Sequence, residues 1–254
     1  MSERVKIILD KNADILRLPA IALRGLVVFP GNIIHFEVGR KKSIAAIEWA
    51  MSNNNAVFLT AQQDMDVEDP GFKDLYAYGV VAEVKQVLRV SDELVKVLVE
   101  GKYRAKLLTL DSSGRFLLAS TKAAALRGTK SVDSARVEAL VRSVKEAFEE
   151  YLSLNPRLSK DVVYTIITNE DAALLCDYIP ANLLLKYTDK QALLNEGTVS
   201  GRLEKLLEIL RRETKILHIE KDIQSKVNEQ MDKNQRDYYL REQMRAISNE
   251  LDDF

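Results

Sequence analysis

The feature of this sequence that most constrains its fold is the absence of any proline or glycine from position 202 to the end of the chain. At about 1.5 Å per residue, fifty helical residues would extend roughly 75 Å, far longer than a helix buried in one small domain. Between 221 and 237 the only apolar residues are Ile223, Val227 and Met231, so its own domain buries little of this stretch. We therefore predict that residues 200–254 form a very long helix, either a solvated strut or one strand of a coiled coil.

The last part of this predicted helix carries more apolar residues. Leu240, Met244, Ile247 and Leu251 recur at 4-3-4 spacing, which is typical of one helical face. Such a face needs something to pack against, and aromatic and methionine side chains provide adaptable apolar contacts. We predict a surface for assembly or for docking of a further domain, formed by Met231, Tyr238, Tyr239, Leu240, Met244, Ile247 and Leu251.

The first half of the chain has the period of β-strands. Val80, Ala82, Val84, Leu88 and Val90 fall on one face and Glu83, Lys85 and Arg89 on the other, interrupted only by Gln86. A second alternating run starts at Val95 after the polar turn 91–93. These two runs are predicted to pair as an antiparallel hairpin. A single helix, with Ser43 as its N-cap, interrupts the strands. Several short antiparallel strands around one helix predict a small barrel-like sheet over residues 1–125.

The period changes to that of helices after residue 126. Val137, Leu140, Val141, Val144 and Phe148 follow one helical stripe, and further helices are predicted to end before Pro180 and to start at a capping box of Thr188 and Gln191. Residues 126–199 are therefore predicted to be a helical bundle. The fold class that follows is α+β: a β pseudobarrel with one helix, then a helical bundle that ends in a very long helix.

Charge and targeting patterns exclude several classes of protein. The 37 Lys and Arg residues balance 38 Asp and Glu residues, so no net field favours nucleic acid as a partner. The N-terminus has no apolar signal-peptide core, and no run of 18 apolar residues follows. We expect a cytoplasmic location without membrane contact. The lone cysteine, Cys176, lies in an apolar run and is interpreted as a small buried thiol.

The sequence offers no set of catalytic or metal-binding residues. It has no GxxxxGK[ST] motif for nucleotide phosphates. His35 and His218 have no spaced cysteine or carboxylate partners for zinc, and the acidic run from Asp64 to Asp69 lacks the spacing of a calcium loop. We predict no catalysis, no metal and no cofactor for this chain by itself.

Apolar residues beside predicted turns are the remaining candidate for function, because chain segments commonly reach the surface there. They are interpreted as a patch that holds apolar-rich, unfolded segments of other proteins. An open alternative for each is that it fills the barrel core. The candidate residues are Leu23, Phe29, Pro30, Ile33, His35 and Leu88.

Four blocks of the sequence resemble bacterial ATP-dependent Lon proteases of the LonA type. Residues 18–30 are similar to the family's "LPLRGLVVFP" block, 38–43 to its "VGR-KS" step and 97–105 to its "VLVEG-RA" strand pair. Residues 235–251 resemble the helix that leads into the family's ATPase module. The order and spacing of the blocks match over roughly the whole chain, although the turn at 91–93 lacks the glycine common in the family.

The resemblance implies a PUA-like pseudobarrel that recognises unfolded or damaged proteins, and a chain that ends before the ATPase module. It also implies a hexameric parent protein, an ATP-dependent serine endopeptidase that uses ATP and Mg²⁺. Two alternatives are a stand-alone PUA-like RNA-binding module and a free-standing scaffold protein. RNA binding requires a basic groove, whereas residues 200–254 contain 11 basic and 12 acidic residues.

Overall fold

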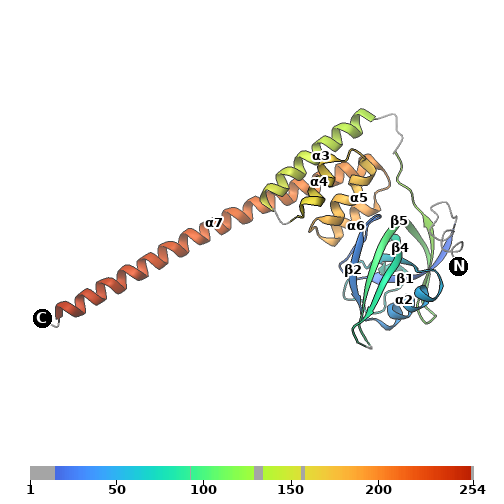
Figure 1. Ribbon diagram of the computed structural model, residues 1–254, viewed down its shortest axis with the longest axis horizontal. Helices are drawn as coiled ribbons and strands as arrows, with labels where there is room; N and C mark the ends of the chain where they lie inside the picture. Colours follow the sequence, from blue (N-terminus) through green and yellow to red (C-terminus); the bar gives the residue numbers. More distant parts are fainter. Residues whose placement is uncertain (1–14, 92, 129–133, 156–157, 253–254) are drawn as a thin grey trace.

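The computed structural model describes residues 15–91, 93–128, 134–155 and 158–252. Figure 1 shows a β-rich unit at the N-terminal end, a group of helices beside it, and one helix that projects far beyond both. The predicted α+β class is therefore confirmed. A cluster of buried apolar side chains continues from the β-rich unit, for example Val97, into the helices at Val144 and Leu203.

The β-rich unit is a six-stranded sheet that closes on itself. Its order is β2-β5-β4-β3-β1-β6, and a further pairing of β5 with β6 completes a ring of β1, β3, β4, β5 and β6. The 17 residues of β5 allow this, because residues 95–100 pair with β2 and residues 105–111 pair with β6. The strands are β1 (Leu16–Leu23), β2 (Ile33–Val38), β3 (Ala56–Ala61), β4 (Tyr78–Arg89), β5 (Val95–Asp111) and β6 (Leu117–Ala123).

The predicted hairpin is formed by β4 and β5, which pair in antiparallel register from Arg89 and Val95 onwards. Its register shifts between Val84 and Gln86. This bulge is the physical reason for the break in alternation at Gln86, since one extra residue on a strand inverts the faces that follow it.

The helix within the β-rich unit is α2 (Lys41–Asn53), and a short 3₁₀ helix, η1 (Phe72–Asp74), precedes β4. The predicted cap at Ser43 is wrong: the N-cap is Arg40, three residues earlier, and the Ser43 side chain is buried. Helical spacing in the sequence assigns Ile44, Ile47 and Met51 to the apolar face of α2; Ile44 and Ile47 are buried, whereas Met51 is exposed and Ala50 is buried in its place. Asn55, at a φ of 58°, lets the chain turn directly into β3.

The helical part comprises α3 (Ser134–Leu154), α4 (Lys160–Thr168), α5 (Ala172–Asn182), α6 (Tyr187–Asn195) and α7 (Val199–Asp252). Two predicted boundaries are wrong. Helix α5 continues through Pro180 to Asn182, since a proline in the last turn removes only one helical hydrogen bond. Helix α6 begins at Tyr187 with Lys186 as its N-cap and no capping side chain. The Gln191 side chain donates instead to the Tyr78 carbonyl on β4, at 2.8 Å.

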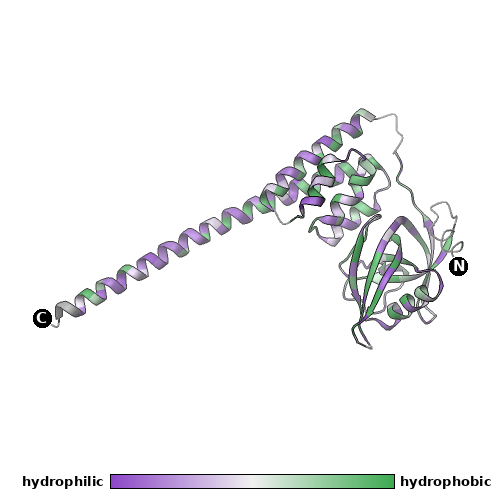
Figure 2. Ribbon diagram, in the orientation of Figure 1, coloured by the Kyte–Doolittle hydropathy of each residue, from purple (hydrophilic) through white to green (hydrophobic). Residues whose placement is uncertain are grey.

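The predicted very long helix is α7, with 54 residues. Its first turns pack against α3, α5 and α6, and Leu203, Leu206 and Leu210 are buried there. From residue 218 to residue 249 every side chain is exposed. Figure 2 shows this distal part as mainly hydrophilic with separate hydrophobic residues along it.

Candidate protein-binding surface

The outer face of β2, β5 and β4 presents apolar side chains that no described element covers. Cross-strand partners lie on the same face of a sheet, and the register aligns His35 with Leu98 and Leu98 with Gln86. Ile33 is 62% exposed and Leu88 is 57% exposed. We call this surface the outer patch and define it as Ile33, His35, Gln86, Leu88 and Leu98.

A small pocket lies within the outer patch. It has a volume of 180 Å³ and is lined by His35, Gln86, Leu88, Lys96, Val97 and Leu98. Two residues of the predicted patch, His35 and Leu88, thus meet at one pocket although 53 positions separate them in the sequence (88 − 35). Leu98 was not predicted, because the alternation of its strand assigns it to a face without showing whether that face is covered.

Two residues of the predicted patch belong to the core instead. Leu23 and Phe29 are buried, so they are not part of an exposed surface. The segment before β2 runs tightly over β5: a Cβ atom added at Gly101 would lie 2.3 Å from the Phe29 carbonyl oxygen. This close approach, which the missing side chain of glycine permits, directs the Phe29 side chain inwards.

Pro30 lies away from the outer patch. It is half-buried and lines a different cleft, of 720 Å³, between the barrel and the helices. The structure therefore brings together Ile33, His35 and Leu88 of the six predicted residues and separates Leu23, Phe29 and Pro30 from them.

Charged residues beside the outer patch neutralise one another. Lys85 Nζ lies 2.9 Å from Glu83 Oε2 and 2.8 Å from Glu100 Oε2, and Lys102 Nζ lies 3.0 Å and 2.6 Å from the same two oxygens. Hydrogen bonds from Lys102 and Lys85 hold the pKa of Glu100 below its usual value. The two lysines and two glutamates of this group, which bridges β4 and β5, carry no net charge together.

A groove separates β2 from the C-terminal half of β1. It has a volume of 320 Å³ and is lined by residues 21–24 and 36–40, with Leu26 and Ser43. Arg40 crosses it, donating from Nη1 to the Ala22 carbonyl at 3.3 Å and from Nη2 to the Val67 carbonyl at 3.0 Å. Burial, and then the nearby charge of Arg24, lower the pKa of Arg40. We call this the β1–β2 groove.

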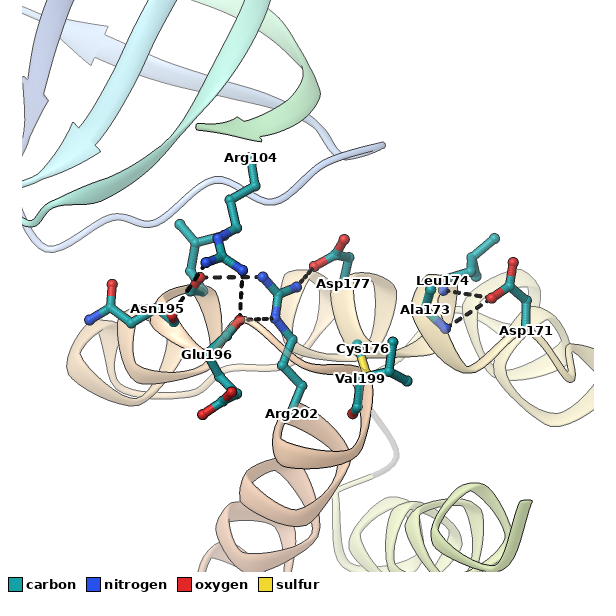
Figure 3. A network of polar contacts seen from close by, with 11 residues as sticks. Arg104, Asp171, Ala173, Leu174, Cys176, Asp177, Asn195, Glu196, Val199 and Arg202 are labelled. Atoms are coloured by element: carbon teal, nitrogen blue, oxygen red, sulfur yellow. Dashed lines mark hydrogen bonds and ion pairs between the residues drawn. The ribbon is translucent and has the colours of Figure 1, made fainter. Parts of the chain in front are cut away.

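Two buried arginines connect the barrel to the base of α7, as Figure 3 shows. Arg104 of β5 donates to the carbonyls of Glu196 and Asn195 at 2.7 and 3.4 Å. Arg202 of α7 donates to Glu196 and Leu194 at 3.0 and 3.3 Å and forms an ion pair with Asp177 of α5. Both guanidinium groups thus satisfy the last carbonyls of α6, where cations are favoured by the helix dipole.

The same joint also holds Tyr78. The guanidinium carbon of Arg104 lies 4.2 Å from the centre of the Tyr78 ring, a cation–π contact. Burial and the nearby charge of Arg202 lower the pKa of Arg104. Sequence patterns did not identify these arginines, because a buried arginine cannot be distinguished from a surface one without its partners.

All six predicted assembly residues whose side chains are described are exposed: Met231, Tyr238, Tyr239, Leu240, Met244 and Ile247. Leu251 lies outside the described side chains. This part of α7 thus carries an apolar set without a partner in the described structure, which leaves the predicted assembly role a prediction.

The described residues hold no group of three or more His, Cys, Asp or Glu side chains with the arrangement of a metal site. None of their helices is both long enough and apolar enough to cross a membrane. Cys176 is buried, as predicted, with its Sγ atom 3.8 Å from the Val199 carbonyl oxygen. Burial raises the pKa of its thiol to about 12, so the reactive thiolate is not formed near neutral pH.

Similarity to known proteins assigns the chain to a family. Residues 17–212 match the model of the ATP-dependent protease La (LON) substrate-binding domain. The chain is 39% identical over 251 residues to a Lon protease of Heliobacterium modesticaldum, which covers 99% of this chain and 30% of that protein. It is also 39% identical over 241 residues to the Lon protease of Escherichia coli K12, covering 95% of this chain and 30% of that protein. The chain thus spans about 30% of the length of these curated relatives.

Solved structures with the same fold are the N-terminal domains of Lon proteins. One, from the Mycobacterium avium complex, has a TM-score of 0.62 at 20% identity and covers 77% of this chain and 98% of that one. Another, from Xanthomonas campestris, has a TM-score of 0.53 at 15% identity, with 76% and 98% covered. The sequence matches, the fold and the family model agree: this chain belongs to the Lon substrate-binding domain family.

Proposed function

We propose that this chain recognises unfolded or damaged proteins for an ATP-dependent Lon protease and helps to assemble that protease. The observation that carries the proposal is the outer patch, where Leu88 lines a small pocket and both Leu88 and Ile33 are exposed. Apolar side chains that are buried in folded proteins become available in unfolded ones, and exposed apolar surface of this kind marks binding sites.

Binding by one copy is expected to be weak. The pocket of 180 Å³ is smaller than the 300–1,000 Å³ of typical small-molecule sites, by a general estimate, and ordering an unfolded chain costs free energy. An assembly of several copies, hexameric in the parent protein, raises the effective concentration of patches without stronger single contacts. The exposed residues of distal α7 are proposed to make the contacts of that assembly.

The parent protein is proposed to be a cytoplasmic serine endopeptidase that uses ATP and Mg²⁺, while this chain contributes no catalytic group, cofactor or metal. No nucleic acid and no membrane are proposed as partners. The division into a β-rich recognition domain at 1–125, a helical bundle at 126–199 and a long helix at 200–254 remains a prediction, which limited proteolysis tests.

Titration of the chain with reduced, carboxymethylated α-lactalbumin, which cannot refold, tests the proposal. The account predicts binding that Leu88→Asp weakens at least about fivefold, because a carboxylate in the pocket would be desolvated by an apolar ligand. Val227→Asp, on the distal half of α7, serves as the control and should leave single-copy affinity unchanged. Tight binding of labelled RNA that weakens steeply with salt, and no binding of the unfolded protein, would favour the RNA-binding alternative instead.

A further inference from the structure

The strand β2 has a free edge. It pairs with β5 on one side, and no described strand pairs with its other side. The closed ring of the barrel is completed without β2, through the pairing of β5 with β6. An unpaired edge exposes backbone N–H and C=O groups that form a template for another extended chain.

The register identifies the residues whose backbone groups face outwards. Gly101 donates its N–H to Asn32 and accepts from Gly31, so its backbone groups point towards β2. Alternate residues of β5 point the same way, and among these Val99 and Val97 have Ile34 and Phe36 as their partners. The N–H and C=O groups of Ile33, His35 and Glu37 therefore point away from β5, into the free edge.

The sequence of β2 carries little of the protection usual at strand edges, since Glu37 is its only charged residue. Natural edge strands carry proline, lysine, a bulge or a covering element that prevents pairing with another chain. β2 reads Ile-Ile-His-Phe-Glu-Val, has no proline or lysine, and pairs with β5 without a register shift. The free edge borders the β1–β2 groove, which contains Phe36 and Leu26, so there is space for apolar side chains beside it.

The free edge is continuous with the outer patch. The backbone N–H and C=O groups of His35 point into the free edge, as the register of β2 and β5 requires. Its side chain lines the pocket of the outer patch. A strand added at the edge would place alternate side chains beside Ile33 and His35 on the outer face and beside Phe36 on the other.

We propose that an extended segment of an unfolded polypeptide, with apolar side chains at alternate positions, binds by adding a strand to the free edge of β2. This inference rests on the proposed function and names how the substrate is held. Only another extended backbone presents donors and acceptors at the spacing of the outward N–H and C=O groups of residues 33, 35 and 37. Main-chain bonding is independent of side-chain identity, which suits a protein that binds many unfolded sequences.

The test compares two variants of the full chain at one position. His35→Pro removes the outward N–H and is tolerated at a strand edge, whereas His35→Ala removes the side chain and keeps the N–H. The probe is a short fluorescein-labelled peptide in which valine alternates with serine or lysine, followed by fluorescence anisotropy. We expect His35→Pro to weaken binding about tenfold, as for loss of one or two main-chain hydrogen bonds and their register, and His35→Ala to weaken it less than about threefold.

A second arm changes the peptide and leaves the protein intact. The same peptide with methylated backbone nitrogens keeps its side chains and loses its main-chain donors, so it should bind at least about tenfold more weakly. If circular dichroism shows that His35→Pro fails to fold, the methylated peptide still tests strand addition. Glu37→Pro, with Glu37→Ala as its control, then replaces the variants at position 35.

Three results would overturn the inference. The first is equal affinity for the methylated and unmethylated peptides. The second is an equal loss of affinity from the proline and alanine variants. The third is a dimer, detected by light scattering, that dissociates in His35→Pro without any change in peptide binding. The occupant of the edge would then be a second copy of the chain. If main-chain changes have no effect while Leu88→Asp still weakens binding of unfolded protein, strand addition is contradicted and the proposed function stands. If the chain binds no unfolded probe, the proposed function is contradicted as well.

Discussion

The two ends of α7 are parts of one continuous helix, yet they are held in opposite ways. Residues 199–217 bury Leu203, Leu206 and Leu210 against the other helices, and Arg202 ties them to α5 and α6. Residues 218–249 are exposed throughout. The comparison shows that a helix can continue well beyond the domain that anchors it when its sequence contains no breaker.

This difference matches the two proposed roles of recognition and assembly. The base of α7, α6 and the barrel are connected by hydrogen bonds of Arg104, Arg202 and Gln191, so the outer patch is held in a fixed position relative to the start of α7. The distal half carries exposed apolar residues up to Ile247, and it is available for contacts with other copies or domains. Variants at matched positions of the two halves test whether they differ as much in solution.

The largest difference is expected from arginine variants. Arg202→Met removes an ion-pair partner of Asp177 and the donor to Leu194 and Glu196, and breaking a buried pair of this kind costs about 3–5 kcal/mol. Arg236→Met, in the exposed distal half, is the matched control and should change stability by less than about 0.5 kcal/mol. Urea unfolding measures both, and equal costs for the two variants would contradict the comparison.

Matched leucine variants test the same contrast through packing. Leu206→Ala leaves a cavity in the core and should lower the free energy of unfolding by about 3 kcal/mol, since Leu206 is fully buried. Leu240→Ala changes an exposed side chain and should cost less than about 0.5 kcal/mol. A cost for Leu240→Ala that grows with protein concentration would reveal that a second copy covers the distal half.

A smaller effect is expected from pH. The pKa of Glu100 is lowered by its hydrogen bonds with Lys102 and Lys85, so its folded pKa lies below its unfolded one. The stabilisation from Glu100 is then fully present above the unfolded pKa of about 4.3 and is lost as pH falls through the folded pKa. For this partly exposed group the loss should be at most about 1 kcal/mol, and urea midpoints between neutral pH and pH 3 should show a weaker acid dependence in Glu100→Gln.

The smallest effect is expected within distal α7. Glu229 and Lys233 form an ion pair of 2.7 Å at four-residue spacing, with both side chains about two-thirds exposed. Glu229→Gln should therefore cost less than about 0.5 kcal/mol, and salt should reduce that cost. Helicity measured by circular dichroism provides the check; a large loss of helix would show that single surface pairs, and not the lack of breakers, maintain this half.

The sequence predicted the elements whose evidence is local. The alternation around Val80 and Val95 identified the hairpin, and the absence of proline and glycine after Gly201 identified α7. Capping was less predictable. Thr188 and Gln191 have the spacing of a capping box, but α6 already begins at Tyr187, and the Gln191 side chain donates to the Tyr78 carbonyl of β4.

The candidate surface was only partly predictable. Leu23 and Phe29 are as apolar as Ile33 and Leu88, yet the first two are buried and the last two are exposed. Phe29 lies in the segment that packs closely against Gly101, whereas Ile33 lies on β2, which has one unpaired side. These are contacts between distant segments, which hydrophobic patterns do not encode. The same reason hid Arg104 and Arg202, whose burial depends on the carbonyl groups at the end of α6.

Hydrogen exchange of the chain with and without carboxymethylated α-lactalbumin tests the central claim most directly. If unfolded protein binds at the outer patch and the free edge of β2, the amides of residues 33–38 and 86–98 should exchange more slowly in the complex, while those of residues 219–249 remain unchanged. Protection confined to residues 219–249, with none at β2 or at the tips of β4 and β5, would contradict the account.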